Sequence, residues 1–150
     1  MGRSGKVAVL AAAVLSGCLG VCSAVRAADA PVDFDTQIKP IFKQSCIKCH
    51  SLDNPRKSAA SGLQLDVKEA ALKGGKKGKD KDIVPGDSTQ SFVYKLLLGP
   101  TSIDGKHVDA MPKQKKGEEF KPLEKEQIEL IKSWIDQGAK WPDAATTTPK

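Results

Sequence analysis

The chain has 150 residues, of which 39% are hydrophobic and 5% aromatic, and its formal net charge is +6 at pH 7. This length, without an internal repeat, suits one small globular domain. Removing the first 27 residues leaves 21 basic and 18 acidic residues, a balance of only +3, and two of the four cysteines. We therefore expect neither a disulfide framework nor, in the absence of a nucleic-acid motif, nucleic-acid binding.

The start of the chain has the pattern of an export signal. Basic Arg3 and Lys6 precede an uncharged apolar run from Val7 to Val25, and small residues lead into the polar segment ADAP. We predict a signal peptide over residues 1–27 and export to the periplasm. These residues then take no part in the fold.

Two other interpretations of this segment stay open. The uncharged run is nearly long enough to span a bilayer and could remain as a membrane anchor. The sequence LSGC, which ends at Cys18, resembles a lipoprotein processing box, and cleavage there would leave Cys18 as a lipidated N-terminus that tethers the protein to a membrane. In each case the chain leaves the cytoplasm.

The first helical pattern after the signal covers Asp33–Gln44. Its apolar side chains recur at helical spacing, and Asp33 or Asp35 can accept hydrogen bonds from the first free backbone N–H groups. Pro40 removes one backbone hydrogen bond, so the helix either kinks there or begins near it.

A second, short helix is predicted over Leu65–Gly75, with Asp66 as its N-cap and glycines that stop it. The next segment, Gly74–Asp82, is rich in lysine and has no apolar side chain to bury. We interpret it as a solvated, flexible loop.

A third short helix is predicted within residues 87–100. Asp87 or Ser88 can cap its start, Phe92 and Leu96 belong to its apolar face, and a glycine ends it. The pattern is typical of a helix that lays one face on a core.

The clearest helix lies within residues 122–142, where a stripe of isoleucines is widened by Leu130 and Trp134. Acidic residues in its first turn suit the helix dipole, and Gly138 ends it. Burial of five such side chains is worth about 1.5 to 3 kcal/mol each, so this helix should dominate stability by packing against the first one. The last residues, 143–150, are predicted to form a disordered tail.

The chemistry of the chain is concentrated in QSCIKCHS, residues 44–51. Cys46 and Cys49 stand three positions apart, on one side of a helical turn, and His50 follows directly. Two thiols at this spacing can add across the two vinyl groups of a haem, and the adjacent imidazole then meets the iron from one face. C-x-x-C-H is the sequence signature of this attachment, so we predict one covalently held haem c with His50 on its iron.

Two other uses of these residues fit less well. A zinc site would need the adjacent Cys49 and His50 at two corners of one tetrahedron with His107 as a further ligand, and the usual second-histidine spacing is missing. A thiol redox motif would follow a β-strand, and no strand pattern precedes Cys46.

A sixth ligand for the iron has to come from later in the chain. Met111, in DAMPKQ, is the only methionine besides the initiator, and Pro112 biases it toward extended backbone. We predict Met111 as the distal axial ligand, which favours reduced iron. The alternatives are that His107 is the ligand, or that Met111 only fills a gap in the core.

Together these segments resemble the planctomycete-type cytochrome c domain, a branch of the class I c-type cytochromes. The likeness runs from about Phe34 to Pro142, and we delimit the domain as residues 31–142. It is carried by the segments IKPIFKQSCIKCHS, GLQLDVKEAALKGG, IVPGDSTQSFVYKLL, AMPK and PLEKEQIELIKSWIDQGAKWP. The resemblance implies an all-α class I cytochrome c fold, with about four short helices packed around one covalently attached haem.

The resemblance matches Cys46 and Cys49 to the haem-linking positions, His50 to the proximal ligand and Met111 to the distal ligand. Two features depart from the family pattern. Lys113 stands where a second proline usually follows the methionine, and the lysine-rich loop is longer than the Gly-rich loop of the family.

Iron that is ligated on both faces has no open position for a substrate. The predicted function is therefore transfer of single electrons between redox proteins, without enzymatic activity or a small-molecule substrate. The alternative is a haem enzyme or gas-binding module in which Met111 dissociates or never binds. A redox partner would dock near the haem edge, close to Lys48, Lys113, Lys115 and Lys116.

Overall fold

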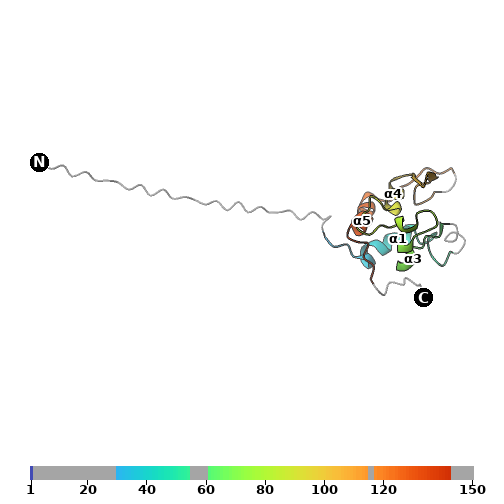
Figure 1. Cartoon of the computed structure of the whole chain (residues 1–150), viewed down its shortest axis with the longest axis horizontal. Helices are drawn as coiled ribbons and strands as arrows, with labels where there is room; N and C mark the ends of the chain where they lie inside the picture. The colour runs from blue at the N-terminus through green and yellow to red at the C-terminus, as the bar shows by residue number, and fades with distance from the viewer. Residues whose placement is uncertain (2–29, 55–60, 115–116, 143–150) are drawn as a thin grey trace.

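The computed structural model describes Met1 and residues 30–54, 61–114 and 117–142. In chain order its elements are η2 (Phe34–Ile38), α1 (Lys39–Ser45), α3 (Lys68–Lys73), η3 (Lys79–Lys81), α4 (Phe92–Leu98), β1 (Thr101–Ile103), β2 (Lys106–Val108) and α5 (Lys125–Asp136) (Figure 1). The predicted signal peptide and tail fall outside the described residues and stay predictions. Within those residues, every helix is too short or too polar to cross a bilayer.

Pro40 shapes the first helical segment. The π-helix η2 runs directly into α1, whose second residue is Pro40, a position where the missing N–H costs little. At the start of η2 the Asp33 carboxylate accepts from the Thr36 N–H at 2.8 Å, as predicted for a cap. Hydrogen bonds from Thr36 lower the pKa of Asp33, which keeps the cap ionised.

The helix α5 packs on η2 and α1 through four aromatic rings. Phe34, Phe42, Trp134 and Trp141 lie with ring centroids 4.5 to 6.2 Å apart. The predicted isoleucine stripe of α5 is buried in full: Ile128, Ile131 and Ile135. The predicted pairing of the first and last helices is therefore confirmed.

Two helices begin later than predicted. The helix α3 has no side-chain cap, because Asp66 turns away and its Oδ2 accepts from the Leu52 N–H at 3.0 Å. The helix α4 begins only at Phe92, because Asp87 caps the preceding turn by accepting from the Gln90 N–H at 3.1 Å. In both places an aspartate has a local or tertiary partner that competes with the helix.

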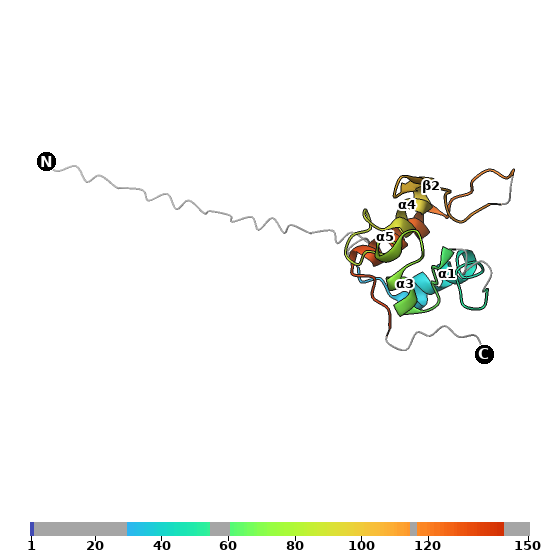
Figure 2. The ribbon, with the colours of Figure 1, turned by 45° about the vertical axis from the view of Figure 1, so that its right-hand side comes forward.

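A β-hairpin overturns the expectation of an all-α fold. The strands β1 and β2 pair antiparallel, with Thr101 opposite Val108, and lie beyond α4 at the upper end of the molecule in Figures 1 and 2. The turn residues Asp104 and Gly105 have φ values of 50° and 74°, the left-handed conformations that an Asp-Gly turn supplies. The fold is mainly helical with a small two-stranded sheet. The all-α prediction is wrong because the Asp104–Gly105 turn closes a hairpin of two three-residue strands.

The apolar core is divided into two clusters. The larger cluster joins η2, α1, α3, α4 and α5, and partly buried Cys46 packs against it. The smaller cluster consists of Leu96, Ile103 and Val108, with Phe92 and Met111 packed against it. Because α4 contributes to both clusters, it connects the region of Cys46 with that of Met111.

Candidate functional site

Cys46, Cys49 and His50 lie on a single turn that continues α1. The Cys46 N–H donates to the Phe42 carbonyl at 2.8 Å, and the N–H groups of Cys49 and His50 both donate to the Cys46 carbonyl, at 3.0 and 2.9 Å. Neither cysteine forms a disulfide, and both are half-buried. The structure therefore gathers the two thiols and the imidazole on one turn, as their spacing predicts.

Burial sets the state of the Cys46 thiol. It raises the pKa of Cys46 to about 12, and the neighbouring Cys49 adds to the rise, so this thiol is protonated at neutral pH. A catalyst of thiol–disulfide exchange needs an attacking thiol whose pKa is lowered. The environment of Cys46 is therefore the opposite of the one that such a catalyst requires.

The imidazole of His50 is held from its Nδ1 side. Nδ1 lies 3.3 Å from the Leu63 carbonyl oxygen and 3.3 Å from the Ser61 hydroxyl. A carbonyl can only accept, so this contact favours the tautomer whose proton is on Nδ1. The Leu65 N–H in turn donates to the His50 carbonyl at 2.8 Å, so the segment Ser61–Leu65 contacts both the side chain and the backbone of His50. The Nε2 lone pair is then the one available to a metal.

The electrostatics of the site keep His50 neutral. Burial lowers the pKa of His50, and the Leu63 carbonyl and the negative charge of Asp82 partly oppose that effect. Neutral imidazole is the form that ligates metals. Sequence reasoning did not identify Ser61, Leu63 or Asp82 as neighbours of His50, because no spacing rule relates them to it.

The lysine-rich segment Gly74–Asp82 is folded against this site, contrary to its prediction as a flexible loop. Its lysines are exposed, but Gly75, Gly78 and Asp82 are buried. The Lys76 N–H donates to the Ser61 carbonyl at 2.7 Å, beside the Nδ1 side of the imidazole. Burial also raises the pKa of Asp82, although a hydrogen bond from Gly75 and the proximity of His50 oppose the rise.

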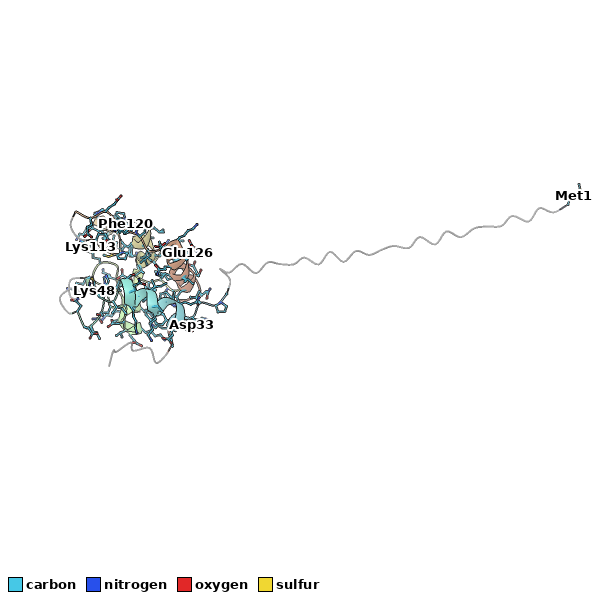
Figure 3. All side chains as sticks on the ribbon, turned by 180° about the vertical axis from the view of Figure 1, so that it is seen from behind. Met1, Asp33, Lys48, Lys113, Phe120 and Glu126 are labelled. Carbon is cyan, nitrogen blue, oxygen red and sulfur yellow. The ribbon has the colours of Figure 1, made fainter. Side chains whose placement is uncertain are left out.

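Met111 is anchored through its backbone. Its N–H donates to the Leu96 carbonyl at 2.8 Å, and its half-buried side chain packs against the smaller cluster. The segments that follow α1 and β2 both lie on the right in Figures 1 and 2, and the labelled Lys48 and Lys113 lie together at one side in Figure 3. The views agree that the Met111 segment and the Cys46–His50 turn are on the same side of the molecule.

His107 has a different environment. It lies on β2 opposite Ser102, its side chain is 71% exposed, and its Nε2 is 3.4 Å from the Asp109 carboxylate. Exposure in this setting is typical of a surface histidine. The structure thus places Met111, and not His107, against an apolar cluster.

The proposed zinc alternative finds no geometric support among the residues described. In residues 30–54, 61–114 and 117–142, no three His, Cys, Asp or Glu side chains gather closely enough to hold a metal ion.

The residues present fit a haem. Two thiols that form no disulfide, an imidazole with its Nε2 lone pair available and an adjoining apolar core are the features of a c-type cytochrome site. A family comparison agrees, because residues 46–115 match the family described as planctomycete cytochrome C. Residues 46–115 thus resemble a planctomycete-type cytochrome c domain, which suggests a haem-binding c-type cytochrome. No curated protein and no solved structure matches the chain.

The family match has informative limits. It begins at Cys46 and extends past Met111, so it includes every residue predicted to hold the haem. It does not include η2, α1 or α5, whose aromatic cluster forms much of the larger core cluster. The match therefore supports the assignment of the site residues, and it gives no information on the helices η2, α1 and α5 that pack beside them.

Proposed function

We propose that the protein carries single electrons between redox proteins through one haem, covalently linked to Cys46 and Cys49. His50 and Met111 would be the two axial ligands of its iron. When bound, the haem supplies a one-electron couple between ferric and ferrous iron. The observation that carries the proposal is the orientation of His50, whose Nδ1 faces the Leu63 carbonyl while its Nε2 is available on the same turn as two thiols.

The fold prepares His50 to act as a ligand. The hydrogen bond that Nδ1–H donates to the Leu63 carbonyl fixes the rotation of the ring and raises the basicity of Nε2. Because burial lowers the pKa of His50, the ring needs to lose no proton before it binds a metal at neutral pH.

The two apolar clusters support the proposed pair of attachments. Cys46 packs against the larger cluster, and Met111 packs against the smaller one. An apolar ring system held by both residues would add buried contacts to each cluster and keep water from the iron. Ligands on both faces would leave electron transfer, and not substrate binding, as the work of the site.

The role of Met111 leads to a spectroscopic prediction. Met111→Ala should abolish the weak red absorption band that ferric iron shows with a methionine ligand, because no thioether then reaches the iron. The haem should stay covalently attached, since neither thiol is changed. The ferrous variant should also bind carbon monoxide much faster than the unchanged protein, as stopped-flow absorbance would measure.

The matched control for this experiment is His107→Ala. His107 is exposed on β2, so its removal should leave both the red band and the slow binding of carbon monoxide unchanged. A band that persists in Met111→Ala, or disappears in His107→Ala, would remove Met111 from the proposed role. Rapid carbon monoxide binding by the unchanged protein would favour a gas-binding or enzymatic function instead.

Docking of redox partners is proposed at the surface that carries Lys48 and Lys113. Both lysines are exposed and lie at the same side of the molecule (Figure 3). The Lys113 ammonium is 2.9 Å from the Asp109 carboxylate, so part of its charge is neutralised. Lys115 and Lys116 fall outside the described residues. An acidic partner surface would be steered toward Lys48 first, with a rate that falls as salt rises.

We also propose that the protein is exported from the cytoplasm. Cytochrome c domains are typically exported, and the signal predicted over residues 1–27 would take the chain to the periplasm. Processing at Cys18 would add a membrane tether without altering the proposed electron transfer.

A further inference from the structure

The loop Gly74–Asp82 is folded around one buried carboxylate. Asp82 is 6% exposed, and its Oδ2 accepts from the Gly75 N–H at 2.6 Å. A Cβ added to Gly78 would lie 1.8 Å from Asp82 Oδ1, so the backbone of the loop closes against the second oxygen as well. The Asp82 side chain, at the end of the loop, is therefore held against the backbone at Gly75 and Gly78.

The same loop is in backbone contact with the segment that holds His50. A Cβ added to Gly75 would lie 2.5 Å from the Ser61 carbonyl oxygen and 2.9 Å from the Leu63 nitrogen. The Lys76 N–H donates to that Ser61 carbonyl at 2.7 Å. Ser61 and Leu63 supply the two oxygens at 3.3 Å from His50 Nδ1. The buried carboxylate is thus connected to the imidazole through two backbone contacts.

Charge connects the two groups as well. Asp82 is joined through Gly75 to Ser61 and Leu63, whose oxygens lie 3.3 Å from His50 Nδ1, so its negative charge is on the Nδ1 side of the imidazole. A negative charge in a partly desolvated place favours positive charge nearby. Ferric iron carries one more positive charge than ferrous iron, so the negative charge of Asp82 would favour the ferric state of an iron bound to His50.

We propose that the Gly74–Asp82 loop is a positioning element for His50, in which the buried Asp82 carboxylate holds Ser61 and Leu63 against Nδ1 and lowers the reduction potential of the haem. The inference rests on the proposed function, because it requires haem iron on His50. Asp82 acts through the residues between it and the imidazole and touches no reacting atom.

Asp82→Asn removes the charge but keeps an oxygen that can accept from Gly75. The midpoint potential of the holoprotein, measured by redox titration, should rise by up to about 59 mV, a tenfold shift in the equilibrium of a one-electron couple. Haem content and the red absorption band should not change. Asp80→Asn is the matched control, because it makes the same charge change on an exposed side chain of the same loop, and it should leave the potential unaltered.

Gly78→Ala tests the position of the carboxylate without a change of charge. The added methyl group would occupy the place of Oδ1, so the carboxylate must move away from its present partners. The potential should again rise, and the Nδ1 proton of His50 should exchange with solvent faster by NMR. A merely structural role of the loop would lower the melting temperature and leave both readouts unchanged.

The outcomes separate the inference from the function on which it rests. A holoprotein in which Asp82→Asn has the same potential as Asp80→Asn would overturn the inference and leave electron transfer standing. Unchanged protein that contains no haem would overturn the proposed function itself. If Gly78→Ala does not fold, the comparison of the two aspartate variants decides the question alone.

Discussion

Changing both Cys46 and Cys49 to serine is expected to yield a protein without covalent haem, even from a host that matures c-type cytochromes. A serine hydroxyl cannot form the thioether bonds proposed for these positions, and both side chains lie on the turn that carries His50. Haem staining after denaturing electrophoresis measures the result directly, because only covalently attached haem stays with the chain.

The same double variant should also fold less stably. The haem would no longer be fixed against the larger core cluster, on which Cys46 packs, so part of the buried apolar area would be lost. Cys22→Ser is the matched control, since it makes the same change of sulfur to oxygen inside the predicted signal peptide, and it should retain full haem staining. Equal staining of the double variant and the control would contradict the proposed attachment.

The second large effect is expected at Trp134, at the contact between α5 and the first helical segment. Trp134→Ala should lower the free energy of unfolding by about 3 to 5 kcal/mol, the usual cost of removing a large buried ring. Trp134 is 1% exposed, packs against Phe34, Phe42 and Trp141, and donates from its indole nitrogen to the Lys140 carbonyl at 2.9 Å. Denaturant unfolding of the holoprotein, followed by circular dichroism, measures the change.

Leu98→Ala provides the comparison for this loss. Leu98 is also an apolar residue on a core helix, but its side chain is 59% exposed, so its truncation should change stability by no more than about 0.5 kcal/mol. Similar unfolding curves for Trp134→Ala and Leu98→Ala would show that the four rings do not dominate the stability of the protein.

The turn that carries Cys46, Cys49 and His50 was the most predictable part of the molecule. Cys46, Cys49 and His50 lie within five residues, so a single helical turn determines their arrangement whatever the rest of the chain does. The α5 helix was predictable for a related reason, because the stripe that includes Ile131 and Trp134 repeats at the helical period over three turns.

The hairpin and the helix starts were less predictable. Strands β1 and β2 have three residues each, too few for an alternating pattern to stand out, and only the Asp104–Gly105 pair marks the turn. Asp66 has the right chemistry for a cap at α3, but it bonds to Leu52, fourteen residues away in the chain. Local propensity does not reveal a tertiary partner of this kind.

The neighbours of His50 depend on contacts between distant parts of the chain. Leu63 is 13 residues from His50, and Asp82 belongs to a loop whose lysines made it resemble solvated linker. Burial of a carboxylate in that loop depends on close backbone packing at Gly75 and Gly78, which composition does not reveal. The residues proposed to tune the iron were therefore found only from the structure.

The most direct test of the account is the intact mass of the exported protein, measured under denaturing conditions after expression in a host that matures c-type cytochromes. The account predicts the mass of the processed chain plus one haem, with no loss of pigment after extraction with acidified solvent. A mass equal to that of the processed chain alone, or a pigment that the solvent removes, would contradict it.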